Sequence, residues 1–180
     1  MRDDAGSVIH MQKTVIAPAQ GHVEAGELDG PQCSLAVATH HPDCTRVEIN
    51  GLVYPDGTAR VQTRELLGLI EKILGDLDGS MADIVRLRWY VDDTVLDSAT
   101  RGAIHEVRAE FFDYPQFPAS CMIAVPSGES AATDSEPTGS ASTGGNDPSG
   151  GEIELEATAI VPADGSWTVR TITGDETTDA

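Results

Sequence analysis

Two hydrophobic periods alternate along the chain, and their order limits the folds that it can form. Between Val61 and Leu77 apolar residues recur at helical spacing, which predicts an amphipathic helix. Between Ile84 and Val91 the period falls to two, as in a half-buried strand. The side chains expected on the buried face of this strand are Val85, Leu87, Trp89 and Val91. A helix followed by such a strand predicts a sheet that carries a helical layer.

The same patterns predict further elements on either side. Two short strands are expected at 34–38 and 45–49, with Asn50-Gly51 ending the second, and a second helix is expected at 99–112. The last two strands are expected at 120–125 and 153–161. The order β-β-α-β-α-β-β is typical of an α+β fold, with a sheet that has two helices on one face.

Composition divides the chain. Residues 127–150 are almost all small or polar, so they cannot form a core and are predicted to be a disordered insertion. Residues 1–30 are predicted to be a flexible N-terminal extension, in which 8–17 offer a short strand. Residues 163–180 form an acidic C-terminal tail. The part between them, 31–162, is long enough for one domain that carries the insertion.

Acidic residues dominate the charge. Thirty Asp and Glu stand against 11 Lys and Arg, giving a net charge of −19. Such a charge repels phosphate backbones and argues against nucleic-acid partners. It also keeps a protein hydrated in concentrated salt, where the Debye length falls to about 3 Å at 1 M. We therefore expect a halophile-type protein; the alternative is an ordinary acidic protein with disordered acidic ends.

No membrane, metal or disulfide pattern stands out. No apolar run approaches the roughly 20 residues of a membrane span, and no signal peptide is visible, so we expect a cytoplasmic protein without a membrane partner. Three cysteines without CxxC spacing argue against a disulfide framework. His40-His41 near Cys44 suggests either a metal cluster or a polar turn, and the turn is favoured because adjacent residues of an extended chain point apart. No cofactor is expected.

Several short segments carry a family resemblance. They are Asp83-Ile84-Val85-Arg86-Leu87, Ala109-Glu110-Phe111-Phe112, Pro118-Ala119 and Ile153-Glu154-Leu155-Glu156-Ala157. Together with the order of elements over residues 31–161, outside the insertion, they make the chain similar to the RidA/YjgF family of imine and enamine deaminases. The resemblance implies a chorismate-mutase-like fold with one mixed sheet, and a homotrimer with a small-molecule pocket at each subunit interface. It also implies hydrolysis of 2-iminopropanoate or 2-iminobutanoate to a keto acid and ammonia.

The resemblance assigns a catalytic role to Glu154, which matches the glutamate that orients the attacking water. The alternative is a solvated strand face, because Glu152 and Glu156 flank it on the same side. The resemblance implies further substrate-binding positions at Asn50, which replaces a family serine, at Gly51, which is retained, and at Cys33, which falls near a family tyrosine. Leu52 stands where the family has a glutamine.

Ser120 occupies the position of the family arginine that holds the substrate carboxylate. Losing such a contact costs about 1.5–3 kcal/mol per charged hydrogen bond. Arg86, Arg88 or Arg108 could supply a guanidinium from another strand or subunit. The alternative for Arg86 and Arg88 is a polar sheet face or ion pairs within the trimer.

Two functions therefore remain open. The chain is either an imine deaminase with a diverged cleft, or a non-catalytic trimeric protein of the same fold that binds or senses a small molecule. A third hypothesis is a different reaction on a less anionic substrate, suggested by Leu52 and Ser120. The acidic surface gives no support to a ribonuclease.

Overall fold

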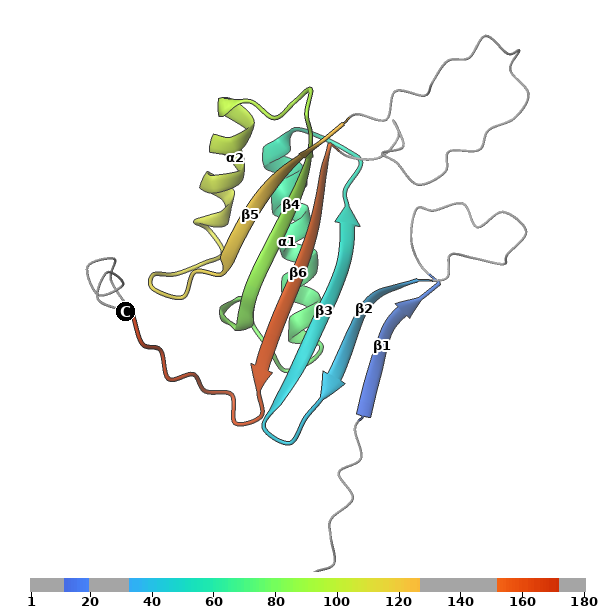
Figure 1. Ribbon diagram of the computed structural model, residues 1–180, viewed down its shortest axis with the longest axis vertical. Coiled ribbons are helices and arrows are strands. Elements are labelled where there is room, and N and C mark those ends of the chain that lie inside the picture. The colour runs from blue at the N-terminus through green and yellow to red at the C-terminus, as the bar shows by residue number, and fades with distance from the viewer. Residues whose placement is uncertain (1–11, 20–32, 127–151, 172–180) are drawn as a thin grey trace, which may run out of the picture.

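The computed structural model describes residues 12–19, 33–126 and 152–171, which form one sheet packed against two helices (Figure 1). The strands are β1 (Gln12–Pro18), β2 (Ser34–His40), β3 (Cys44–Val53), β4 (Ile84–Asp92), β5 (Ala119–Val125) and β6 (Ile153–Pro162). The helices are α1 (Ala59–Gly75) and α2 (Ser98–Arg108), and a short 3-10 helix, η1 (Met81–Asp83), leads into β4.

The sheet is mixed, and its strands run in the order β1-β2-β3-β6-β4-β5. Only β4 and β5 pair in parallel among the described strands, and the other neighbours are antiparallel. The last strand of the chain, β6, therefore lies between β3 and β4 (Figure 1). This central position brings residues near the C-terminus beside residues from the middle of the chain.

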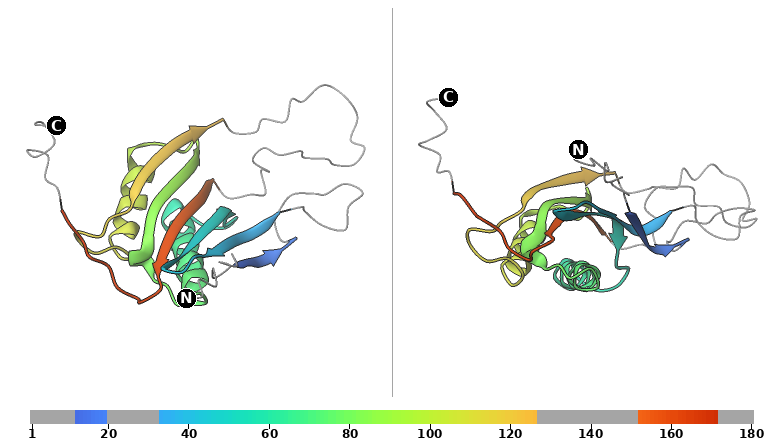
Figure 2. Two further views of the ribbon diagram at one scale, coloured as in Figure 1. Left: turned by 60° about the horizontal axis from the view of Figure 1, so that its bottom comes forward. Right: turned by 90° about the horizontal axis from the view of Figure 1, so that it is seen from below.

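Both helices cover the same face of the sheet, as the right-hand view of Figure 2 shows. The core lies between the two layers and includes Leu66, Leu67, Ile70 and Leu74 of α1, and Leu87, Trp89, Leu155 and Ala159 of the sheet. The opposite face, which we call the open face, carries no helix of the described residues. Neither α1 nor α2 is long and apolar enough to span a membrane.

The predicted order of elements and the α+β class are confirmed. One residue of β4 was placed on the wrong face. Val85 is 37% exposed, whereas Ile84 is 3% exposed and joins the core. The β4–β6 ladder shifts register between Ile84 and Arg86, so the alternation holds only from Leu87 onward.

The prediction that Asn50-Gly51 ends the second strand is wrong. β3 continues to Val53, and its pairing with β6 is irregular between Ile49 and Leu52. Such an irregularity inserts extra backbone into one strand without ending it. Leu52 is 2% exposed and belongs to the core, so it does not line a cleft on the open face.

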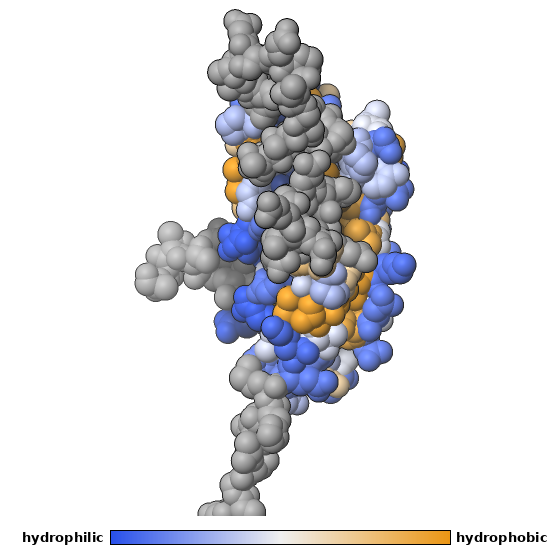
Figure 3. All heavy atoms as spheres, turned by 90° about the vertical axis from the view of Figure 1, so that its right-hand side faces the viewer, coloured by the Kyte–Doolittle hydropathy of each residue, from blue (hydrophilic) through white to orange (hydrophobic). Residues whose placement is uncertain are grey.

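The two ends of the described chain add to the sheet and its rim. β1 lies within the segment assigned to the N-terminal extension and pairs with β2. Figure 3 looks onto this edge and shows apolar surface bordered by hydrophilic side chains; Val15 of β1 is 41% exposed. Beyond β6, Trp167 donates an indole hydrogen bond to Asp83 (2.6 Å).

The insertion at 127–150, most of 1–30 and the end of the tail lie outside the described residues, and the domain boundaries stay predictions.

Candidate functional site

Polar side chains gather on the open face where β4 and β6 run side by side. Leu87, Trp89 and Leu155 point into the core, so the residues between them point the other way. The antiparallel ladder places Arg88 opposite Glu156, and Tyr90 opposite Glu154. We call these four side chains the β4–β6 cluster: Arg88, Tyr90, Glu154 and Glu156.

Glu156 is the hydrogen-bond acceptor of this cluster. Its Oε2 accepts from Nη1 of Arg88 (3.1 Å) and from the hydroxyl of Tyr90 (3.3 Å). The hydrogen bond to Glu156 raises the pKa of Arg88. Burial, followed by the nearby Glu156 carboxylate, raises the pKa of Tyr90. Glu156 therefore holds the side chains of both Arg88 and Tyr90 in place through one carboxylate oxygen.

Glu154 lies beside this group but has no partner of its own. It is half-buried, and its carboxylate makes no hydrogen bond or ion pair with the residues that the structure describes. Burial, and then the negative charge of Glu156, raises the pKa of Glu154. A carboxyl group in this setting exchanges a proton closer to neutral pH than an ordinary glutamate does. Glu154 is thus equipped for general acid–base chemistry.

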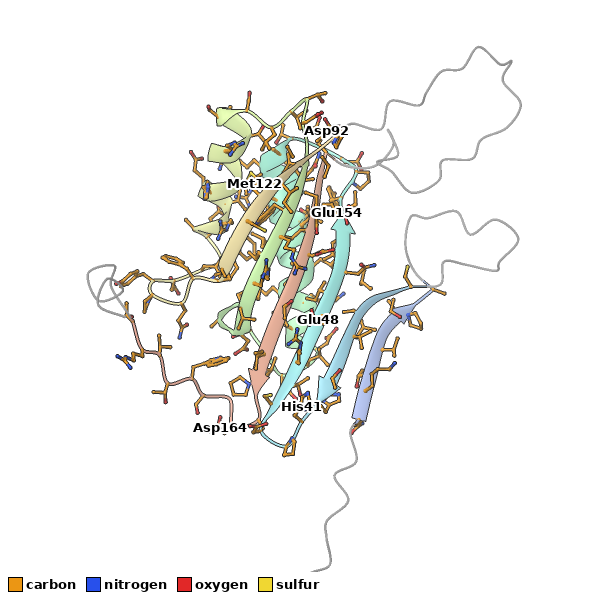
Figure 4. All side chains as sticks on the ribbon, viewed as in Figure 1. His41, Glu48, Asp92, Met122, Glu154 and Asp164 are labelled. Atoms are coloured by element: carbon orange, nitrogen blue, oxygen red, sulfur yellow. The ribbon has the colours of Figure 1, made fainter. Side chains whose placement is uncertain are left out.

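Gly51 makes room for the carboxyl group of Glu154. A Cβ atom added at Gly51 would lie 2.6 Å from Cδ of Glu154 and would overlap its Oε1. Gly51 is part of the irregular stretch of β3, which pairs Val53 with Glu154 and Leu52 with Leu155. Figure 4 shows Glu154 on β6 beside the end of β3, with Glu48 farther along the same sheet.

A cavity of about 390 Å³ opens on the same face. It is lined by residues of β2, β3, β4 and β6 and by Cys33, which precedes β2; its polar lining includes Ser34, Glu48, Asn50, Arg86, Arg88, Glu156 and Thr158. Two substrate-binding residues expected from the sequence, Cys33 and Asn50, therefore meet here. Glu154 does not line the cavity, but Glu156, two positions along β6, does.

Ser120 does not join this group. In the parallel ladder it pairs with Leu87, which is fully buried, so Ser120 lies on the helix-covered side of β5. Its neighbour Cys121 pairs with Arg88 and shares the open face. The structure thus brings Cys33, Asn50, Gly51 and Glu154 to one face and leaves Ser120 on the other.

The three arginines expected to replace the missing guanidinium differ in position. Arg108 lies on α2, in the helical layer, where burial lowers its pKa. Arg86 and Arg88 both line the cavity of the open face. Arg88 is held by Glu156, whereas Arg86 makes no ion pair with the described residues. Of these three arginines, only Arg86 and Arg88 can therefore meet a ligand on this face of the same subunit.

The predicted turn lies at 41–43, between β2 and β3, so it includes His41, whereas His40 is the last residue of β2 and has ordinary hydrogen-bond partners. Its ring nitrogens meet the hydroxyls of Thr14 (2.8 Å) and Thr45 (3.0 Å), while the backbone N–H of His41 donates to the carbonyl of Cys44 (2.8 Å). Within 12–19, 33–126 and 152–171 no group of three or more His, Cys, Asp or Glu side chains is placed to hold a metal ion.

Comparison with known proteins agrees with this architecture. The sequence profile of the family described as Endoribonuclease L-PSP matches residues 35–134, more than half of the chain. Solved structures with the same fold carry the names YjgF and RidA. The chain therefore belongs to the RidA/YjgF family, whose profile is the one described as Endoribonuclease L-PSP. No curated protein matches the sequence.

Three solved structures illustrate the likeness. A member of the YjgF/YER057c/UK114 family from Mycobacterium tuberculosis is 24% identical, with a TM-score of 0.55, covering 83% of this chain and 100% of that one. A YjgF family protein from Neisseria meningitidis is 17% identical (TM-score 0.55; 84% and 96% covered). RidA from an Antarctic Psychrobacter is 17% identical (TM-score 0.52; 82% and 99% covered). At these identities the likeness establishes the fold alone.

Proposed function

We propose that this protein is a cytoplasmic, homotrimeric imine deaminase that hydrolyses a small 2-imino acid to a keto acid and ammonia. The observation that carries the proposal is Glu154, a half-buried carboxyl group with a raised pKa and no partner among the described residues. The proposal also rests on the family resemblance, which assigns the attacking water to this glutamate. The open face, free of helices, is where a neighbouring subunit would complete the cleft.

The reaction needs one group that can accept and return a proton. Ionised Glu154 accepts a proton from water while the water oxygen bonds to the imine carbon and the imine nitrogen takes up a proton from solvent. The resulting carbinolamine then loses ammonia as Glu154 returns its proton to the leaving nitrogen and the new hydroxyl loses its own. No redox step occurs, and one water is consumed for each ammonia released. A raised pKa suits a group that must act as base and acid in turn.

The experiment is a coupled assay in concentrated salt. The imine 2-iminopropanoate is generated in situ from an amino acid, and release of pyruvate is followed for the wild type, Glu154→Ala and Ser120→Arg. The proposal predicts wild-type turnover that Glu154→Ala abolishes. Because Ser120 faces the helical layer, Ser120→Arg is expected not to raise the rate. Wild-type turnover no faster than the uncatalysed reaction would refute the proposal.

The second candidate is a trimeric small-molecule-binding protein without catalytic activity. Two observations favour it: Ser120 lies away from the open face, and the guanidinium of Arg88, a diagonal neighbour of Glu154 in the ladder, is already bound to Glu156. This candidate predicts saturable ligand binding without ammonia release. A ribonuclease is not proposed, despite the family's description, because a net charge of −19 repels RNA phosphates.

A further inference from the structure

The β4–β6 cluster contains a guanidinium whose hydrogen-bonding capacity is mostly unused. Arg88 gives one hydrogen bond, from Nη1 to Glu156, and its side chain is 42% exposed. A guanidinium has five N–H donors in a planar fork. The Nε and Nη2 groups of Arg88 make no hydrogen bond with the described residues, and Arg88 lines the cavity, so these donors remain for a ligand there. Such a fork binds carboxylates through two parallel hydrogen bonds.

The position of Arg88 relative to Glu154 suits a short ligand. Arg88 is opposite Glu156, and Glu154 is two residues along β6, so Arg88 and Glu154 are diagonal neighbours in the ladder. Diagonal neighbours in an antiparallel ladder are about 7–8 Å apart, within reach of long side chains. The space between them is bordered by Tyr90, whose hydroxyl points to Glu156. A short 2-imino acid can therefore place its carboxylate at Arg88 and its imine carbon toward Glu154.

Charge in the cavity favours Arg88 as the recognition residue. Glu48 already accepts hydrogen bonds from Arg46 (2.6 Å) and Thr158 (2.8 Å), and Glu156 accepts from Arg88 and Tyr90. Both carboxylates are thus partnered, which lowers their repulsion toward an incoming anion. Arg86 also lines the cavity, but it is opposite Thr158 in the ladder and two residue pairs farther from Glu154 than Arg88 is.

We propose that Arg88 holds the carboxylate of the ligand on the open face, taking the role that Ser120 cannot fill from the other side of β5. Glu156 is then a positioning residue that fixes the guanidinium through Nη1 and leaves its free edge toward the cavity. The inference rests on the proposed function for the identity of the ligand, a short-chain 2-imino acid. It adds that the residue that recognises the carboxylate lies on β4, whereas the family position for this role, Ser120, lies on β5.

The test measures binding of pyruvate and of its neutral amide, pyruvamide, to the full-length protein by calorimetry at one fixed salt concentration. The wild type is expected to prefer pyruvate. Arg88→Gln is expected to weaken pyruvate binding by at least about tenfold, the cost of one charged hydrogen bond, and to leave pyruvamide binding unchanged. Arg86→Gln removes the same charge from the same strand and cavity, and it is the matched control: it should keep the preference for pyruvate.

The Arg88→Gln variant leaves Glu156 with one partner fewer, so the double variant Arg88→Gln/Glu156→Gln is measured beside it. The double variant removes both charges and should show the same loss of preference, with thermal unfolding as the check that it folds. The inference would be overturned if Arg86→Gln lost the preference for pyruvate over pyruvamide to the same extent, or if Arg88→Gln kept that preference unchanged.

The two proposals fail in different ways. If the wild type shows no deaminase turnover but an Arg88-dependent preference for pyruvate, the inference stands and the protein is a binding protein. If the wild type turns over 2-iminopropanoate and Arg88→Gln keeps both its rate and its preference for pyruvate, the deaminase stands and the role of Arg88 is refuted.

Discussion

Gly51 and Glu154 share one small volume on the open face: a Cβ atom at Gly51 would lie 2.6 Å from Cδ of Glu154. The backbone of β3 approaches β6 closely enough there to seat a carboxyl group only because position 51 has no side chain. This relationship explains why a glycine stands at the irregularity of β3, and it links the shape of the strand to the placement of Glu154.

Gly51→Ala should separate activity from stability. Gly51 does not have a left-handed backbone conformation, so alanine fits its φ, and the atoms in its way belong to the movable end of Glu154. The carboxyl group would rotate aside, and we expect deaminase activity to fall by at least about tenfold, since misplacement by about 1 Å can cost more than that. The check is to measure the deaminase rate and the thermal unfolding of Gly51→Ala and of the wild type under the same conditions.

The matched control is Gly68→Ala in α1, where an added Cβ meets nothing within 4 Å. It should keep full activity and stabilise the protein by roughly 0.5–1 kcal/mol, because alanine favours a helix interior. Equal activity of Gly51→Ala and wild type would show that catalysis does not need the space that Gly51 leaves for the carboxyl group of Glu154.

Glu154→Gln should change how stability depends on pH. The pKa of Glu154 is raised in the folded protein above the ordinary glutamate value of 4.5. Below that value the group is protonated in both states, and its contribution to stability is complete. As pH rises toward the folded pKa, the unfolded chain ionises first, so the wild type loses stability that the glutamine variant keeps.

The measurement is the free energy of unfolding of both proteins from about pH 4 to 8, a window that begins near the ordinary glutamate pKa and extends above it. The advantage of Glu154→Gln should be smallest at the acid end and grow with pH. An advantage that shrinks with rising pH would mean that Glu154 is stabilised, not destabilised, in its ionised form.

Leu155→Ala should test the assignment of faces along β6. Leu155 lies between Glu154 and Glu156 in sequence but is fully buried on the opposite side of the strand. Its truncation should cost about 2–5 kcal/mol of unfolding free energy. Glu152→Ala, at an exposed position just before β6, should change stability by no more than about 0.5 kcal/mol. Denaturant titration of the two variants distinguishes them, and similar small effects would contradict the assigned faces.

Salt should stabilise the folded protein. With a net charge of −19, the acidic side chains repel one another in the compact folded state. This repulsion weakens as the Debye length falls from about 10 Å at 0.1 M salt to about 3 Å at 1 M. We expect the melting temperature to rise steadily over this range of potassium chloride. A melting temperature that falls or stays constant would remove the support for a halophile-type protein.

The hydrophobic periods were enough to predict the order of elements and the shared side of Glu154 and Glu156 on β6, because burial on one face of a strand repeats every second residue. They misplaced Val85 because a register shift in the ladder interrupts that repeat, and pairing partners are not visible in a single strand. The continuation of β3 past Gly51 was missed for a related reason, since Asn-Gly normally signals a turn.

The candidate site was predicted in part. The side on which Glu154 lies follows from the alternation of β6, and Cys33 and Asn50 do line the open-face cavity. The hydrogen bonds from Arg88 and Tyr90 to Glu156 were not predicted. The alternation in 84–91 and 153–161 does indicate that these three side chains lie on the polar faces of their strands, but not that the two strands are neighbours. That Ser120 faces the helices depends on its pairing with Leu87, which no local pattern reveals.

The central claim is that Glu154 catalyses imine hydrolysis on the open face, and the most direct measurement is the rate of pyruvate release from 2-iminopropanoate by wild type and Glu154→Gln in the same concentrated salt. Glutamine keeps the size and the hydrogen-bonding oxygen of the side chain but cannot take up the proton of the attacking water. We predict that wild type exceeds the uncatalysed rate and that Glu154→Gln falls to it. Equal rates for the two proteins would contradict the claim.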